Sequence, residues 1–200
     1  IEILSSRREY TKASPLVVSL GKGNHQITSS WTHPDDEDSD NDDEPLEAAT
    51  TLAITRSNIT FVGTGKDTTT ILGGFRIDNF ENITFKNMTV TNTTENGIGI
   101  HVRNAKVELV DVALEGCGNS ALFILTSIYT VATTVVVATR CEFAHNGDCG
   151  AVLHGSSTSA TLSATFNNCV FNDNEYGGIE VSDKVTIHFP GEATAIHSNG

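Results

Sequence analysis

Two histidines and an arginine fall where repeated segments of this sequence would bring them to one surface. The alternate apolar residues around His101 predict a strand with its apolar side chains inward, so His101 points outward. Alignment of the repeats places Arg76 one repeat earlier and His154 two repeats later, with Leu125 between them. An outward row of Arg76, His101 and His154 could bind an anionic sugar or a metal ion. The alternative interpretation is a set of exposed strand residues without a ligand.

Four aspartates have a spacing that could hold a hard cation. Asp36, Asp38, Asp40 and Asp42 occupy alternate positions in an acidic segment, and Ca²⁺ prefers oxygen ligands. The segment lacks the glycine and the distal glutamate of the EF-hand pattern. A solvated acidic loop inserted at residues 33–48 is the alternative interpretation. We therefore expect no resident cofactor or metal, with weak Ca²⁺ binding left open.

A repeated unit sets the positions of these residues. Each unit contains short runs rich in β-branched residues with period 2, broken by Asn, Gly, Asp and Ser, which predicts strands and turns. A period within about 20–50 residues is typical of proteins built from stacked coils. We therefore predict an all-β solenoid of about seven coils whose strands pair in parallel. The repeat, at intervals of 24 to 29 residues, consists of Asn58–Phe61, Asn82–Phe85, Lys106–Leu109, Val135–Ala138 and Ser163–Phe166.

Alignment of the units also predicts the core. Residues two apart share one face of a strand, so alternate side chains point inward and like residues stack on like from coil to coil. The predicted rows are Ile59, Ile83, Val107, Val136 and Ala164; Phe61, Phe85, Leu109, Ala138 and Phe166; Met88, Val112, Cys141, Cys169 and Thr194; Val90, Leu114, Phe143, Phe171 and Ile196; Ile98, Leu122, Ala151 and Ile179; and Ile100, Ile124, Leu153 and Val181.

Asparagines recur at one turn of the predicted coils. Asn146, Asn174 and Asn199 align with one another, and stacked Asn side chains can form hydrogen bonds along the axis. We expect a structural role, with a catalytic role as the alternative.

The four cysteines have no spacing typical of a metal site. Cys117, Cys141, Cys149 and Cys169 form no CxxC pair. Cys141 and Cys169 should lie on adjacent coils within reach of a disulfide, but side chains in register point the same way, so we expect free thiols.

The charge is uneven along the chain. The formal net charge is −13, and nine of the 25 acidic residues lie between Asp35 and Glu47. The remainder carries 16 acidic residues against 12 basic ones, a balance of −4. Such a body lacks the basic face that nucleic-acid binding requires. No apolar run approaches the roughly 18 residues of a membrane span, and the compartment stays open.

Residues 58–74 resemble the early coil of the right-handed parallel β-helix, or pectate-lyase-like, superfamily. Residues 17–27, 138–147 and 191–200 are similar to β-helix repeat proteins of diatoms and other microalgae, to which no activity is assigned. The resemblance implies a right-handed, single-stranded parallel β-helix over most of residues 16–200. We expect residues 1–200 to form one domain that is part of a longer array. The resemblance implies a fold and no function.

Motifs of the enzymes with this fold are missing from the sequence. The Asn-Thr-Asp and Gly-His-Gly segments of polygalacturonase-like enzymes do not occur, and Trp31, the single tryptophan, has no Arg-x-Trp context. Asp78, Glu180 and Asp183 are too scattered for the paired carboxylates of a glycosidase. We predict a non-catalytic structural or interaction module with a polysaccharide or a protein as partner and an unknown oligomeric state. The alternative is a carbohydrate-active protein, either a binding module or a lyase-, hydrolase- or epimerase-like enzyme with catalytic residues outside this chain.

Overall fold

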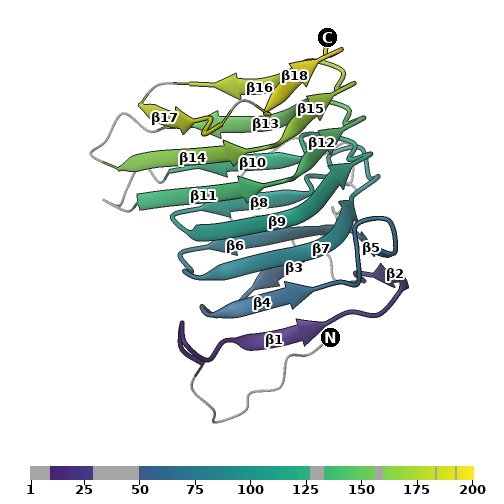
Figure 1. The fold of residues 1–200 in the computed structure, drawn as a ribbon, viewed down its shortest axis with the longest axis vertical. Coiled ribbons are helices and arrows are strands. Elements are labelled where there is room, and N and C mark those ends of the chain that lie inside the picture. Colours follow the sequence, from purple (N-terminus) through teal and green to yellow (C-terminus); the bar gives the residue numbers. More distant parts are fainter. Residues whose placement is uncertain (1–9, 29–49, 127–132, 156–159, 183, 192) are drawn as a thin grey trace, which may run out of the picture.

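The chain winds into a stack of coils in which every strand pairs in parallel with the coil below or above it (Figure 1). The computed structural model describes residues 10–28, 50–126, 133–155, 160–182, 184–191 and 193–200. These residues form β1 Leu16–Ser19, β2 Gly23–Gln26, β3 Thr51–Ile54, β4 Ile59–Val62, β5 Thr69–Leu72, β6 Gly74–Asp78, β7 Ile83–Thr91, β8 Ile100–Arg103, β9 Lys106–Glu115, β10 Leu122–Leu125, β11 Thr133–Thr139, β12 Glu142–Ala144, β13 Cys149–His154, β14 Thr161–Asn167, β15 Val170–Asn172, β16 Gly177–Val181, β17 Val185–His188 and β18 Ala195–His197.

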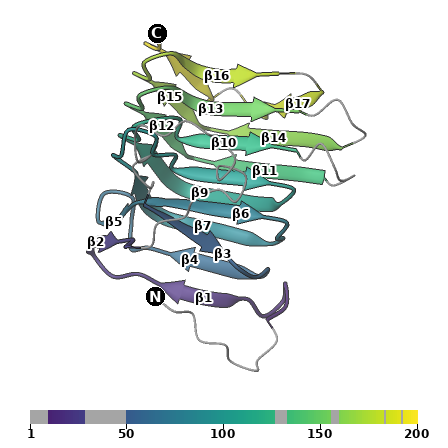
Figure 2. The same ribbon diagram turned by 180° about the vertical axis from the view of Figure 1, so that it is seen from behind.

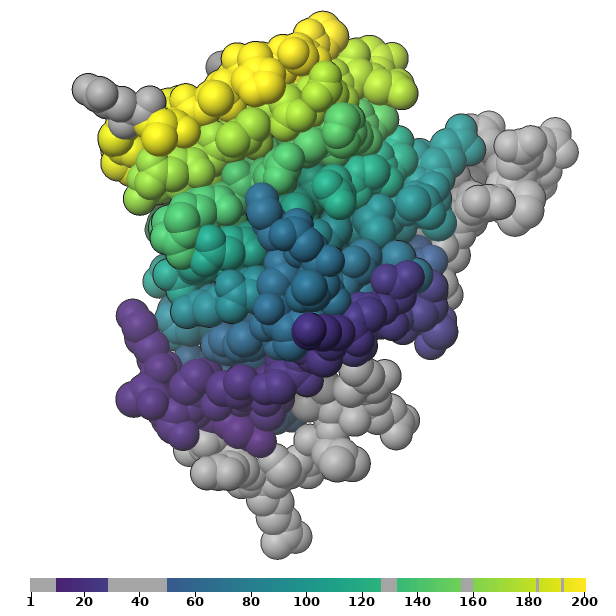
Figure 3. All heavy atoms as spheres, turned by 45° about the vertical axis from the view of Figure 1, so that its right-hand side comes forward, coloured from purple at the N-terminus to yellow at the C-terminus, as the bar shows by residue number. Residues whose placement is uncertain are grey.

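Two sheets enclose the core. The first sheet has 12 strands along the path β1-β4-β7-β9-β11-β14-β17, and β2, β5, β12, β15 and β18 extend it around one corner. The second sheet has six strands in the order β3-β6-β8-β10-β13-β16 and is seen from behind in Figure 2. The seven strands of the long path match the predicted number of coils. The predicted parallel β-helix is therefore confirmed, and the order of residues along the axis follows the sequence (Figure 3).

Asparagines at the corners explain why the repeat begins with Asn-Ile-Thr-Phe. Asn58 and Asn82 take positive φ values of 62° and 57°, a conformation that Asn adopts more readily than most residues. The Asn82 Nδ2 donates a hydrogen bond to the Asn58 Oδ1 at 2.9 Å. The same side chain therefore allows the turn and joins one coil to the next.

The predicted rows on the first sheet are confirmed. Ile59 pairs with Ile83, which pairs with Val107, and the row continues to Ala164 with every member buried. The neighbouring row places Phe61 on Phe85, with ring centroids 5.1 Å apart. The apolar alternation of the sequence thus becomes a continuous core.

The register predicted for the second sheet is wrong by two residues at one coil. Leu122 pairs with Ile100 and not with Ile98, and Ile124 pairs with Val102 and not with Ile100. The cause is turn length, because ten positions separate Val90 from Ile100 whereas eight separate their partners Leu114 and Leu122. A shift of two keeps the same faces of the strands inward, but Ile98 falls in the turn before β8 and is only half-buried, so its predicted place in the core is wrong.

The predicted asparagine ladder is confirmed. Asn146 donates from Nδ2 to the Oδ1 of Asn174 at 2.7 Å, and Asn174 donates from Nδ2 to the Oδ1 of Asn199 at 2.8 Å. Asn146 and Asn174 are buried. The ladder therefore satisfies polar groups inside one corner of the stack.

All four cysteines are buried free thiols, as expected for the Cys141 and Cys169 pair. A hydrogen bond with Cys169, together with burial, raises the pKa of Cys141. The acidic segment at residues 33–48, with Asp36, Asp38, Asp40 and Asp42, lies outside the described residues.

Candidate functional site

A charged cluster lies on the outer face of the second sheet, where β6 and β8 run side by side. Pairing of these strands sets Arg76 beside His101 and Asp78 beside Arg103. The Asp78 carboxylate is the centre of the cluster. Its Oδ2 accepts a hydrogen bond from the Arg76 Nε at 2.6 Å, and its Oδ1 lies 3.3 Å from the Arg103 Nε and 3.9 Å from the His101 Nδ1. We call Arg76, Asp78, His101 and Arg103 the Asp78 cluster.

The Asp78 cluster is only partly open to solvent. The Arg76 side chain is 9% exposed, whereas that of Arg103 is 31% exposed. Two guanidinium groups face one carboxylate, so the cluster carries an excess of positive charge on a chain whose net charge is −13. Charges interact more strongly when they are partly withdrawn from water. The cluster is therefore a local site of positive charge, which attracts anions.

An aromatic ring that the sequence analysis missed stands next to the cluster. Phe123 on β10 pairs with His101 in register, and the two rings stack with centroids 5.6 Å apart. The ring of His154 meets the other side of Phe123 at 5.4 Å, edge on. Phe123 thus lies between two histidine rings. Alternation along β10 points the Phe123 side chain outward, and the correct register places Phe123 beside His101.

The predicted row is correct for its first pair and wrong for its third member. Arg76 and His101 are direct neighbours. His154 pairs with Leu125, which pairs with Arg103, so His154 lies two residues further along the strands than predicted. The His154 Nε2 lies 3.3 Å from the Glu180 Oε1. The two-residue shift at β8 is the reason for the difference. His101 and His154 nevertheless lie close together, because the rings of both contact Phe123. We call these three residues, the Asp78 cluster and Glu180 the patch.

The arrangement favours anion binding over metal binding. Guanidinium groups donate several hydrogen bonds in one plane, which suits carboxylate or phosphate oxygens. Nowhere in the described part of the chain do three or more His, Cys, Asp or Glu side chains converge as they would around a metal ion.

A thiol near the patch is unsuited to nucleophilic chemistry. The Cys149 Sγ lies 3.7 Å from the Asp148 Oδ1 and 3.9 Å from the Glu180 Oε2. Burial, followed by the two carboxylates, raises the pKa of Cys149 to about 11. The thiolate is the reactive form of cysteine. Cys149 is therefore a protonated thiol at neutral pH.

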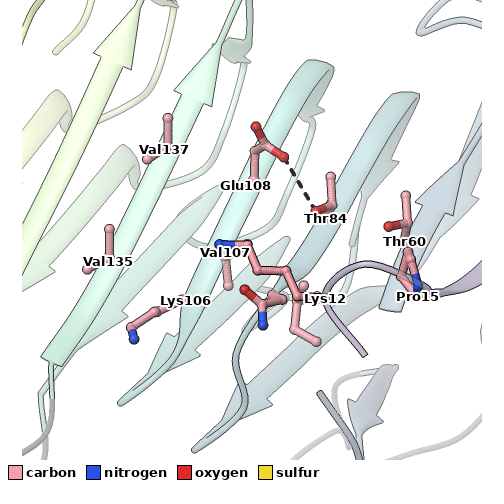
Figure 4. Close-up of a pocket in the computed structure, with 11 residues that line it drawn as sticks. Lys12, Pro15, Thr60, Thr84, Lys106, Val107, Glu108, Val135 and Val137 are labelled. Atoms are coloured by element: carbon pink, nitrogen blue, oxygen red, sulfur yellow. Dashed lines mark hydrogen bonds between the residues drawn. The ribbon is translucent and has the colours of Figure 1, made fainter. Parts of the chain in front are cut away.

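A hollow of about 400 Å³ lies on the first sheet, away from the Asp78 cluster (Figure 4). Thr60, Thr84, Glu108 and Val137 form its floor on successive strands, and Lys12 extends over it. The Thr84 Oγ1 donates to the Glu108 Oε2 at 3.5 Å. Three charged side chains, Lys12, Lys106 and Glu108, are among its lining residues, and the others are uncharged.

The protein-family model described as the right-handed beta helix region matches residues 46–192 of this sequence. The chain belongs to this right-handed β-helix family. The family assignment agrees with the pectate-lyase-like fold expected from residues 58–74, and the likeness to microalgal repeat proteins stays a prediction. Within the described residues, no helix is long and apolar enough to cross a membrane.

Two solved structures are similar in fold. One is a mutant pectin methylesterase in complex with a hexasaccharide, at 8% identity and a TM-score of 0.41, covering 92% of this chain and 74% of that one. The other is ORF18 of Geobacillus virus E2, at 13% identity and a TM-score of 0.38, covering 80% of this chain and 34% of that one. No curated protein sequence matches this member of the β-helix family.

Proposed function

We propose that the chain is a non-catalytic interaction module whose Asp78 cluster binds an anionic ligand, with an acidic polysaccharide as the ligand class. The observation that carries the proposal is the convergence of Arg76 and Arg103 on the single carboxylate of Asp78 beside the Phe123 ring. Guanidinium groups bind carboxylates through charge-assisted hydrogen bonds. An aromatic side chain next to a few polar groups is typical of ligand sites, because it offers an apolar face on which a sugar ring can pack.

The solvent exposure of each side chain indicates which residues would contact a ligand and which would hold the site together. Arg76 is nearly enclosed and holds Asp78 in place through the 2.6 Å hydrogen bond. Arg103 and His154 are 31% and 43% exposed, so they are the groups that a ligand would reach. Phe123 lies between the rings of His101 and His154. We therefore expect Arg103 to contact the anionic group and Phe123 to contact the ring that carries it.

The carboxylates of the patch support a binding role over catalysis. Asp78 is engaged by two arginines, and Glu180 faces His154. A glycosidase of the usual kind needs two carboxylates that face each other across the substrate. Cys149, whose Sγ lies 3.9 Å from the Glu180 Oε2, is protonated at neutral pH because its pKa is about 11. The patch therefore lacks a pair of free carboxylates that face each other and a thiolate nucleophile, which supports the proposal of a binding role.

Binding can be tested with a glycan array, with and without Ca²⁺, followed by calorimetry with oligogalacturonate. The Arg103→Ala variant should weaken binding by about 10- to 100-fold, because a hydrogen bond to a charged group contributes about 1.5–3 kcal/mol. Arg140→Ala is the matched control, since Arg140 forms its ion pair with Asp111 on the first sheet. Equal affinities for Arg103→Ala and wild type would rule out the site.

The absence of catalysis needs a separate measurement. We expect no product when the purified chain is incubated with acidic polysaccharides and assayed for new reducing ends and for unsaturated products. Release of either product by this chain would favour the carbohydrate-active enzyme over the non-catalytic module.

A further inference from the structure

The hollow on the first sheet has a floor of outward side chains in register. Thr60 on β4 pairs with Thr84 on β7, which pairs with Glu108 on β9, and Glu108 pairs with Val137 on β11. Alternation along these strands directs all four side chains away from the buried rows. The volume of about 400 Å³ lies within the range of about 300–1,000 Å³ that is usual for small-molecule sites. The hollow therefore has the size to hold a small molecule.

A tight turn above the floor carries Lys12. Thr11 and Ser14 exchange two backbone hydrogen bonds of 3.1 Å, which close the turn. Asn58 anchors the turn on both sides, because its Nδ2 donates to the carbonyl oxygen of Tyr10 at 2.9 Å and its own carbonyl oxygen accepts from the first N–H of β1 at 2.9 Å. The backbone that carries Lys12 is thus held by the next coil, and Figure 4 shows the Lys12 side chain extending over the floor.

Two side chains of opposite charge line the hollow without ion-pair partners. Among the residues that the structure describes, no carboxylate pairs with Lys12 and no cation pairs with Glu108. The Glu108 Oε2 accepts a hydrogen bond from the Thr84 hydroxyl at 3.5 Å. By contrast, the Lys106 Nζ lies 2.7 Å from the Glu81 Oε1. One ammonium group and one carboxylate are therefore available to a ligand that carries a group of each sign.

The hollow also has an apolar part. Val135 and Val137 line it from β11, and Pro15 lines it from the segment that follows the turn. We propose that the hollow binds a small zwitterion, an α-amino acid with an aliphatic side chain. Lys12 donates a charge-assisted hydrogen bond to the carboxylate of this ligand, and Glu108 accepts one from its ammonium group. The aliphatic side chain of the ligand packs on the two valines, where its surface is removed from water.

A series of three ligands tests the role of each charge. Leucine carries both charged groups, isocaproate lacks the ammonium group, and isoamylamine lacks the carboxylate. In calorimetric or NMR titrations of the 200-residue chain, leucine should bind about 3- to 10-fold more tightly than either analogue. This ratio is what the loss of one charge-assisted hydrogen bond costs when its partners stay partly exposed to water. Absence of leucine binding would overturn the proposal, and so would equal affinities for leucine and either analogue.

Two variants assign each charge of the ligand to one residue. Lys12→Met should lower the affinity for leucine about 3- to 10-fold without weakening the binding of isoamylamine, which has no carboxylate. Glu108→Gln should likewise weaken the binding of leucine but not that of isocaproate. Lys22→Met is the matched control, since Lys22 is exposed in the turn before β2 and does not line the hollow. Thermal melting checks that the variants are folded, and equal losses for Lys12→Met and Lys22→Met would contradict the proposal.

The hollow and the Asp78 cluster lie on different sheets, so the two sites should bind independently. The Arg103→Ala variant should bind leucine as tightly as wild type does, and oligogalacturonate should not displace leucine. Displacement by oligogalacturonate, or weaker leucine binding by Arg103→Ala, would place leucine at the Asp78 cluster and would contradict the proposal.

Discussion

Phe143 and Phe171 lie ring on ring on neighbouring coils, with centroids 4.5 Å apart and ring planes within 5° of parallel. Phe166 meets both rings edge on, at 5.8 and 5.1 Å. All three side chains are fully buried. Offset-stacked and edge-to-face contacts are the favoured arrangements of aromatic rings. These three residues therefore form a compact centre for the C-terminal half of the core.

Replacement of Phe143 by Ala should lower the free energy of unfolding by about 3–5 kcal/mol, because it leaves a cavity between Phe171 and Phe166. Denaturant unfolding measures the change. Tyr176→Ala, at a side chain that is 72% exposed, should change the stability by less than about 0.5 kcal/mol. A loss below about 1 kcal/mol for Phe143→Ala would be incompatible with this packing.

The core could be predicted from the sequence because apolar side chains occupy alternate positions of the strands in every coil. The 28-residue spacing of their segments alone predicts that Phe143 and Phe171 stack, and they pair in register. Alternation decides which side chains face inward. The turns between strands need no constant length for this to hold.

The neighbours within the candidate site could not be predicted as accurately, because the turns between the strands vary in length. The turn before Ile100 is two residues longer than the turn before Leu122. A shift of two leaves the inward and outward faces unchanged, so apolar patterning cannot detect it. The shift nevertheless changes which outward residues are neighbours. It replaced Leu125 with Phe123 beside His101, and it brought Arg103 rather than His101 into the row of His154.

Replacement of Asn174 by Ala should destabilise the fold more than replacement of Asn199. Asn174 accepts from both the backbone N–H and the Nδ2 of Asn146, and it donates to the carbonyl oxygen of Phe143 and to Asn199. Each buried polar group left without a partner costs about 1–3 kcal/mol. Asn199 is half-buried, whereas Asn174 is buried. Thermal and denaturant unfolding of the two variants checks the order, and equal losses would contradict a buried ladder.

Stability should fall in alkaline solution because of Cys117. Burial raises the pKa of this thiol from 9.0 to about 11. An unfolded chain would lose the proton first, so the stabilisation is complete below the unfolded pKa and is lost as pH rises towards 11. The difference corresponds to about 2–3 kcal/mol when fully expressed. Unfolding free energies of wild type and Cys117→Ala, measured at several pH values from neutral to alkaline, should converge as the pH rises. A constant difference would show that Cys117 does not titrate on unfolding.

Deletion of residues 35–44 should leave the β-helix intact and remove any binding of Ca²⁺. The strands on either side, β2 and β3, are held by in-register pairing with β5 and β6, and neither ladder includes the deleted residues. The deletion removes eight acidic residues and changes the formal net charge from −13 to −5. We expect a cooperative melt for the deletion variant and no heat of Ca²⁺ binding in calorimetry. A full-length variant with Asn at positions 36, 38, 40 and 42 is the matched control, because it removes the alternate carboxylates without shortening the chain. Loss of a cooperative melt in the deletion variant, with a normal melt in the control, would mean that the segment caps the N-terminal coil.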